Sequence, residues 1–230
     1  MTGGVRREMA AGVRDILPPM IAAAPIGMLY GALSVAKGMA PVEASLSSGL
    51  IFAGGAQFAA LELWRQPPPI LALVFSTLLI NARHILMGAS LKPKLSRFAT
   101  LQRAFGLFFM ADENWAMAER RAATHALTPA YFLAMGAIFW LNWVAWTSIG
   151  ALAGSLMGDP KRIGADFAFT ALFIGLVAGF WKGRSTAVTV AASALAAALA
   201  YRLAGPPWHV AAGALAGILA AYLHAPRAGA

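Results

Sequence analysis

The chain has 230 residues, of which 60% are hydrophobic and only 12% are charged. Soluble domains carry about 25% charged residues, so this composition excludes a soluble protein. Continuous apolar runs also exclude a β-barrel, whose strands alternate apolar and polar residues. A net charge of +9 would suggest nucleic acid in a soluble domain. In a membrane protein it indicates cytoplasmic loops near anionic lipid head groups. We therefore predict an all-α polytopic membrane protein that contacts membrane lipids and binds no nucleic acid.

Glycine and proline breakers divide the chain into about eight apolar helical elements. In chain order they cover 14–36, 42–64, 70–91, 104–118, 129–157, 163–181, 185–203 and 208–224. No hydrophilic domain interrupts them. We predict a single transmembrane domain over 14–225, preceded by a cytoplasmic segment, 1–13, and followed by a short tail, 226–230.

A weak internal repeat relates the two ends of the chain. At an offset of 119 residues, Gly31 aligns with Gly150, Pro41 with Pro160 and Arg83 with Arg202. Two halves of four elements each, about 14–118 and 129–224, are a pattern that many transporters show.

The basic residues test the topology of these halves. If every element crosses the membrane, Lys and Arg divide almost equally between its sides. If the second and sixth elements are re-entrant or broken, most basic residues share the side of the N-terminus. Those left opposite are Lys37, Arg65, Arg120, Arg121 and Arg202. The positive-inside rule favours this second arrangement. Each half then has three spans, which predicts an inverted repeat.

Two segments of the first half carry helix breakers at membrane depth. Adjacent glycines weaken a helix and expose backbone groups, which is tolerated where the backbone lines a cavity. Ends of broken helices attract the carboxylate and ammonium groups of an amino acid. We predict a substrate path made of Pro25, Gly27, Gly31, Gly54, Gly55, Gln57, Phe58 and Asn81.

A polar cluster, Asn81-Ala82-Arg83-His84, interrupts the apolar run 70–91. An arginine there costs several kcal/mol unless it is paired, faces water or snorkels to the interface. A histidine can shuttle protons, or form a structural hydrogen bond. The acidic pair that follows is a partner for the arginine, a proton carrier, or an interfacial acidic turn. We predict gating or proton coupling for Arg83, His84, Asp112, Glu113 and Asp166, the last also explained as a helix N-terminal charge.

Several Gly-x3-Gly patterns are typical of close helix packing. Trp140, Trp143 and Trp146 recur at three-residue spacing, which is typical of an interfacial aromatic belt. The chain has no cysteine, so disulfide and thiolate chemistry are excluded. No residue pattern indicates a metal or another cofactor.

Five motifs occur in a fixed order along the chain. They are Pro25-x-Gly27-x3-Gly31, FAGGAQF from Phe52 to Phe58, Asn81-x-Arg83-His84-x2-Met87, Asp112-Glu113 and Gly164-x-Asp166-Phe167. The ordered set resembles the AzlC (YgaZ-like) family of branched-chain amino acid exporters over most of 12–225. The resemblance implies export of valine, leucine, isoleucine or analogues from a bacterial inner membrane. It also implies a small multi-span membrane subunit of the AzlD (YgaH-like) type as partner.

These observations favour a secondary transporter subunit, driven by ion exchange, for example of protons, or by the substrate gradient. The chain has no P-loop, so it is not itself an ATPase. It has neither an H-E-x-x-H metal site nor a G-x-S-x-G elbow, so we do not expect an enzyme. Two alternatives stay open: an intramembrane enzyme using His84 with Asp112 or Glu113, and a permease for another small amphipathic solute.

Overall fold

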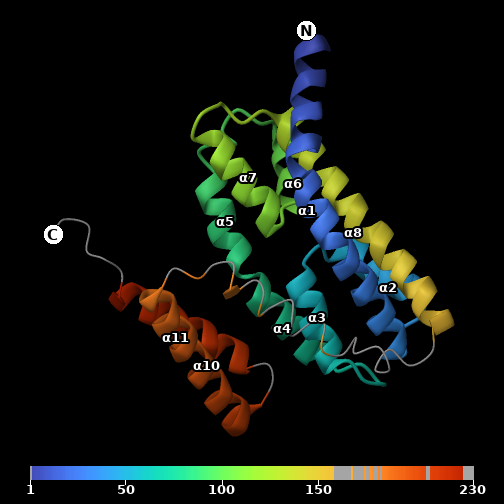
Figure 1. Cartoon of the computed structure of the whole chain (residues 1–230), viewed down its shortest axis with the longest axis vertical. Helices are drawn as coiled ribbons and strands as arrows, with labels where there is room; N and C mark the ends of the chain where they lie inside the picture. The colour runs from blue at the N-terminus through green and yellow to red at the C-terminus, as the bar shows by residue number, and fades with distance from the viewer. Residues whose placement is uncertain are drawn as a thin grey trace.

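The computed structural model describes residues 2–157, 167, 174, 177–178, 181, 183–205 and 208–224. Every regular element in these ranges is a helix (Figure 1). By length and composition, four of the described helices can cross a membrane. The prediction of an all-α polytopic membrane protein is confirmed.

Two long parallel helices, α1 (Thr2–Ala36) and α8 (Pro129–Met157), pack against each other along one side of the fold (Figure 1). Their contacts advance together: Gly12 meets Tyr131, Gly27 meets Trp146, and Gly31 meets Thr147 and Ala151. Small residues allow the two backbones to approach closely. The pairs Gly12–Tyr131 and Gly27–Trp146 also follow the offset of the repeat found in the sequence.

Two helical hairpins enter the fold from opposite ends (Figure 1). The first consists of α2 (Pro41–Leu50) and α3 (Gly54–Leu63), and the second of α6 (Thr100–Phe108) and α7 (Asp112–Ala122). Between the hairpins, α4 (Ile70–Asn81) and α5 (Arg83–Leu91) run through the fold with an interruption at Ala82. The hairpin tips, 51–53 and 109–111, meet near mid-height beside this interruption.

The first hairpin begins and ends near the C-terminal end of α1. Ser45, early in α2, accepts a hydrogen bond from Ser148 of α8, and Gly49, near its end, accepts one from Trp140. Helix α2 therefore rises along α8 toward its middle. The second element is broken, as the glycine pair predicted, although the break falls just before Gly54 rather than within the pair.

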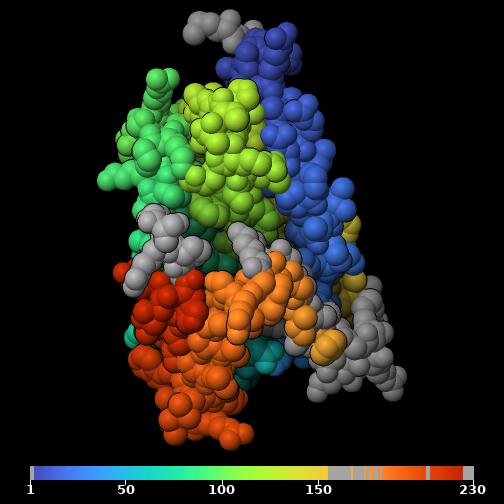
Figure 2. All heavy atoms as spheres, turned by 60° about the vertical axis from the view of Figure 1, so that its left-hand side comes forward, coloured from blue at the N-terminus to red at the C-terminus, as the bar shows by residue number. Residues whose placement is uncertain are grey.

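The second hairpin lies at the end where α1 begins. Arg121, at the end of α7, donates to both carboxylate oxygens of Glu8, with the shorter contact at 2.7 Å. Figure 2 shows the yellow-green residues of α7 against the blue first half of α1. The fourth element was expected to be a single span, 104–118. That expectation is wrong, because α6 and α7 turn back on each other.

Asn114 explains where the second hairpin turns. Its side chain is fully buried, and its Oδ1 accepts the Ala111 N–H at 2.8 Å while its Nδ2 donates to the Phe109 carbonyl at 2.6 Å. These bonds satisfy backbone groups that the helix ends leave open. The amide therefore closes the tip that separates α6 from α7.

The extra hairpin changes the parity of the first half. It leaves only two crossings before α8, namely α1 and α4 with α5, so α8 runs in the same direction as α1. The inverted orientation is therefore wrong for the first elements of the two halves. The sixth element, 163–181, lies almost wholly outside the described residues.

The second hairpin also sharpens the distribution of charge. Within residues 2–157, the end opposite the start of α1 carries Lys37 and Arg65. The end at which α1 begins carries Arg6, Arg7, Arg14, Lys92, Lys94, Arg97, Arg103, Arg120 and Arg121. Arg120 and Arg121 thus lie at the same end of the fold as the N-terminus, not at the opposite end as predicted. A membrane protein with this bias orients its basic end toward the cytoplasm.

The last two described helices, α10 (Arg184–Ala204) and α11 (Trp208–His224), pack against each other, and α11 contacts α4. Gly213 and Gly217 face Ser193 of α10, again a small-residue contact. Gly205, with φ of +70°, ends α10 in a backbone conformation that favours glycine. The pair lies in the lower part of Figure 2, in orange and red.

The α1–α8 contact yields a stability prediction. A Cβ at Gly31 would collide with the backbone of Thr147 and Ala151, whereas at Gly88 in α5 it would meet only a Leu107 methyl group at 3.7 Å. Alanine is otherwise the better helix former. We expect Gly31→Ala to destabilise the protein by about 1–3 kcal/mol through overpacking. Gly88→Ala is the matched control. In detergent its melting temperature should equal or slightly exceed that of the unsubstituted protein. Equal melting temperatures for both variants would contradict the packing.

Candidate functional site

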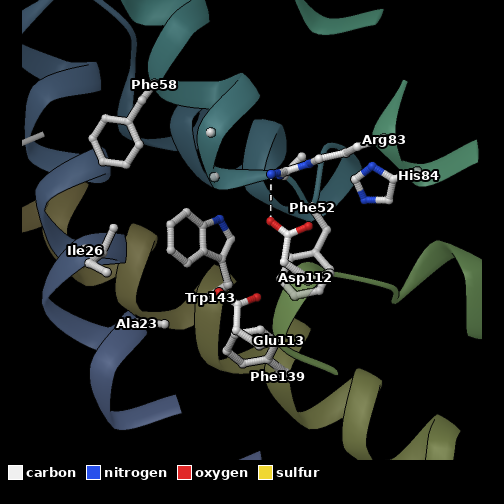
Figure 3. Close-up of a pocket in the computed structure, with 14 residues that line it drawn as sticks. Ala23, Ile26, Phe52, Phe58, Arg83, His84, Asp112, Glu113, Phe139 and Trp143 are labelled. Carbon is white, nitrogen blue, oxygen red and sulfur yellow. Dashed lines mark ion pairs between the residues drawn. The ribbon is translucent and has the colours of Figure 1, made fainter. Parts of the chain in front are cut away.

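Three helices begin at one cavity in the middle of the fold. It has a volume of about 140 Å³ and lies where the first turns of α3, α5 and α7 converge (Figure 3). The free N–H groups of a helix N-terminus carry a partial positive charge. The lining residues are Ala23, Ile26, Phe52, Ala53, Gly54, Gly55, Phe58, Arg83, His84, Ala111, Asp112, Glu113, Phe139 and Trp143.

The charged side of the cavity contains an ion pair and a further carboxylate. Arg83 Nη1 lies 2.6 Å from Asp112 Oδ2, so the arginine is paired rather than snorkelling to an interface (Figure 3). Glu113 follows on the same first turn of α7 and, within the described part of the chain, forms no ion pair. Its carboxylate is available to a cationic group in the cavity.

His84 bridges two of the helix breaks. Its Nδ1 lies 3.2 Å from the Asn81 carbonyl oxygen and its Nε2 lies 3.3 Å from the Met110 carbonyl oxygen. A carbonyl only accepts hydrogen bonds, and neutral imidazole has a single N–H to donate. A neutral ring therefore donates to one of these two carbonyl groups, whereas a ring with both N–H groups donates to both.

The N-terminus of α3 is open toward the cavity. Its N-cap residue, Ala53, has no side-chain acceptor, and no side chain of the described residues caps this helix. The two glycines that follow carry no side chain between their N–H groups and the space in front of them. Such a helix start favours a carboxylate or another anion.

The rest of the cavity wall is apolar. Ala23 and Ile26 come from α1, Phe52 from the tip of the first hairpin, and Phe139 and Trp143 from successive turns of α8. Phe52 and Phe139 form an edge-to-face pair with ring centroids 5.6 Å apart. The cavity therefore combines opposite charges with an aliphatic and aromatic surface.

The structure brings about half of the predicted site residues to this cavity. Those that line it are Gly54, Gly55, Phe58, Arg83, His84, Asp112 and Glu113. Asn81 lies next to it, in a second hollow that is also lined by Phe52, Ala53 and His84. Asp166 lies outside the described residues.

The remaining predicted path residues lie elsewhere. Gly27 and Gly31 face α8, where their missing side chains allow close packing. Pro25 is exposed on the outer surface of α1. Gln57 is 2% exposed, and its amide bonds to Trp143 and Ser48 instead of lining the cavity.

Sequence reasoning missed the α8 side of the site. Trp143 is 6% exposed at the middle of the 29-residue helix α8, so its interpretation as part of an interfacial belt is wrong. Phe139 and Trp143 are four residues apart and share one helix face. That spacing, together with the buried surface α8 must offer α1, was the available signal.

A known protein family matches the part of the chain that forms this cavity. The family model described as "AzlC protein" matches residues 18–157, a segment that contains every cavity residue. No solved structure matches the chain.

Relatives extend beyond that segment. The chain is 30% identical to "Inner membrane protein YgaZ" of Escherichia coli strain K12 over 222 residues, 93% of this chain and 89% of that protein. It is 34% identical over 189 residues to an "Uncharacterized membrane protein" of Archaeoglobus fulgidus, 81% of each chain. It is 28% identical over 157 residues to "Branched-chain amino acid transport protein AzlC" of Bacillus subtilis strain 168, 68% of this chain and 61% of that protein. The chain is therefore a multi-helix membrane protein that belongs to the AzlC family.

Proposed function

We propose that this chain is the subunit of a secondary transporter that exports valine, leucine and isoleucine across a bacterial inner membrane. The observation that carries the proposal is the central cavity, which offers an unpaired carboxylate, an uncapped helix start and an apolar wall. Those three features match the ammonium, carboxylate and side chain of an aliphatic amino acid. A relative named as a branched-chain amino acid transport protein supports this substrate class.

Each part of the amino acid has a counterpart in the cavity. The ammonium group is placed at Glu113, and the carboxylate at the N–H groups of Gly54 and Gly55. The branched side chain lies against Phe139 and Trp143. Arg83 remains with Asp112 and holds the second hairpin to α5.

Proton exchange is the proposed coupling, and His84 is its carrier. The two carbonyl contacts of its ring are complete only in the protonated state. A ring that loses one proton keeps only one of these two hydrogen bonds. Histidine changes charge near physiological pH, as a coupling group must. Arg83, Asp112 and Glu113 face the same cavity, so substrate charge and ring charge influence each other.

The hairpins are proposed as the gates of this transporter. The basic end is taken as cytoplasmic, which gives the N-terminal segment, 1–13, the location predicted for it. The second hairpin then lies toward the cytoplasm and the first toward the opposite side. A small multi-span subunit of the AzlD type completes the proposed transporter, on the strength of the family resemblance.

Efflux from membrane vesicles tests the proposal. Vesicles containing the chain, with and without a small AzlD-type subunit, are loaded with labelled valine or leucine and diluted. We expect faster efflux than from vesicles without the chain, and competition by isoleucine but not by lysine or glutamate. Folded protein that releases neither amino acid under both conditions would defeat the proposal. Release of a different amphipathic solute alone would favour the permease alternative.

A further inference from the structure

Gln57 belongs to a buried chain of hydrogen bonds behind the cavity wall. Its Oε1 accepts the indole N–H of Trp143 at 2.9 Å, and its Nε2 donates to Ser48 Oγ at 2.9 Å. Ser48 in turn donates to Thr147 Oγ1 at 2.9 Å. Gln57 is 2% exposed, and the exposed fraction of Ser48 and Thr147 is zero. This series of hydrogen bonds thus links α3 and α2 to two successive turns of α8.

The direction of these bonds is fixed by chemistry. An indole nitrogen only donates, so the amide oxygen of Gln57 must face Trp143 and the amide nitrogen must face Ser48. Each of these groups has a partner within the network. A buried hydrogen-bond network of this kind holds its members in one arrangement.

The ring of Trp143 is fixed at two places. Gln57 holds its nitrogen, while its six-membered ring lies against Gly54, where an added Cβ would be 3.1 Å from Cη2 and 3.2 Å from Cζ2. Figure 3 shows the indole among the side chains that line the cavity. Since Trp143 is the largest side chain in the apolar wall, its position determines how much room a bound side chain has.

We propose that Gln57 is a positioning residue, which fixes Trp143 as the wall of the apolar subsite and thereby limits the size of the amino acid side chain accepted. The inference rests on the proposed function, in that the cavity carries an amino acid. A branched aliphatic side chain fits beside a fixed ring. An aromatic side chain requires the ring to move, which the buried hydrogen bonds oppose.

The test uses variants that separate the hydrogen bonds from the volume. Gln57→Met keeps the length of the side chain but has no N–H or oxygen for the network. Gln57→Glu in its protonated form keeps one acceptor and one donor. Trp143→Phe removes the indole itself. Ser148→Ala is the matched control, because it deletes a 2.9 Å hydrogen bond between α8 and α2, to Ser45, at residues that do not line the cavity.

The first measurement is the ratio of valine to phenylalanine transport efficiency in vesicles. We expect Gln57→Met to lower this ratio about tenfold, the scale of discrimination that pocket size gives. The change should come from a higher KM for valine with little change in kcat. Gln57→Glu should restore most of the ratio, and Ser148→Ala should leave it unchanged. In the Trp143→Phe background, Gln57→Met should have no further effect, because Gln57 acts through Trp143.

The second measurement needs no transport. Tryptophan labelled with nitrogen-15 gives an indole N–H resonance for Trp143, identified by its absence in Trp143→Phe. In Gln57→Met this resonance should shift and exchange faster with water. An unchanged resonance, an unchanged ratio, or an equal effect of Gln57→Met with and without Trp143 would each overturn the inference. If Gln57→Met does not reach the membrane, Ser48→Ala is used in its place, because it weakens the same network. Failure of the unsubstituted protein to transport would defeat only the proposed function, since the resonance still reports the positioning.

Discussion

Glu113→Gln is expected to reduce valine export by a factor of about 30 or more, with normal amounts of protein in the membrane. Truncating one partner of a buried charge pair costs about 2–5 kcal/mol, and every 1.4 kcal/mol is tenfold. Glu113 is a carboxylate in the cavity that forms no ion pair among the described residues. Initial efflux rates over a range of internal valine concentrations measure the effect. Glu62→Gln is the matched control, because Glu62 is exposed on α3.

The same variant identifies which end of the substrate Glu113 contacts. Unsubstituted protein should prefer leucine strongly over 4-methylpentanoate, which lacks the ammonium group. In Glu113→Gln that preference should collapse, whereas the preference for leucine over leucinamide, which lacks the carboxylate, should remain. If both preferences persist, the ammonium group is bound elsewhere. If Glu62→Gln loses export equally, the effect is not local to the cavity.

The sequence predicts the site better where it carries polar residues than where it carries apolar ones. Arg83, His84 and the acidic pair at Asp112 are costly at membrane depth, so their presence alone marks a functional region. All of them line the cavity. Trp143 carries no such cost, because a tryptophan is favourable both in a core and at an interface. Its role depends on the partner of its N–H, which composition does not reveal.

The glycines show a related limit. Gly27, Gly31, Gly54 and Gly55 all lie in short glycine motifs, and the sequence groups them as one path. In the structure the first two fit α1 against α8, while the other two open α3 to the cavity. A glycine permits close approach of any neighbour, and only the tertiary arrangement determines whether that neighbour is a helix or a ligand.

The predicted topology is wrong because of one hairpin, formed by α6 and α7. The segment 104–118 is apolar enough to be drawn as a span, but it contains the acidic pair and Asn114, which are typical helix-start residues. If Asn114 is taken as a sign that a helix begins nearby, the segment divides at the tip observed between α6 and α7. The consequence is large, because the resulting change in parity makes α1 and α8 parallel. The charge bias supports the observed arrangement more strongly than the predicted one.

His84→Gln is expected to abolish the stimulation of valine export by a proton gradient. The unsubstituted ring lies within hydrogen-bond distance of two carbonyl oxygens, and only a ring with both N–H groups donates to both. Gain or loss of a proton therefore changes these hydrogen bonds. Glutamine does not change charge with pH. An imposed gradient, acidic outside, should accelerate export about tenfold in the unsubstituted protein, consistent with about 1.5–3 kcal/mol for a hydrogen bond to a charged group.

Exchange of labelled for unlabelled valine separates coupling from binding. Exchange needs the substrate site but no net proton movement, so His84→Gln should retain it while losing gradient-driven export. His125→Gln is the matched control, since His125 is exposed in the connection between α7 and α8. Arg83, Asp112 and Glu113 stay in place in both variants, so the charge of the cavity otherwise remains constant. Gradient stimulation that survives in His84→Gln would assign the proton to another group. Glu113 is the next residue to test, because it faces the same cavity and forms no ion pair among the described residues.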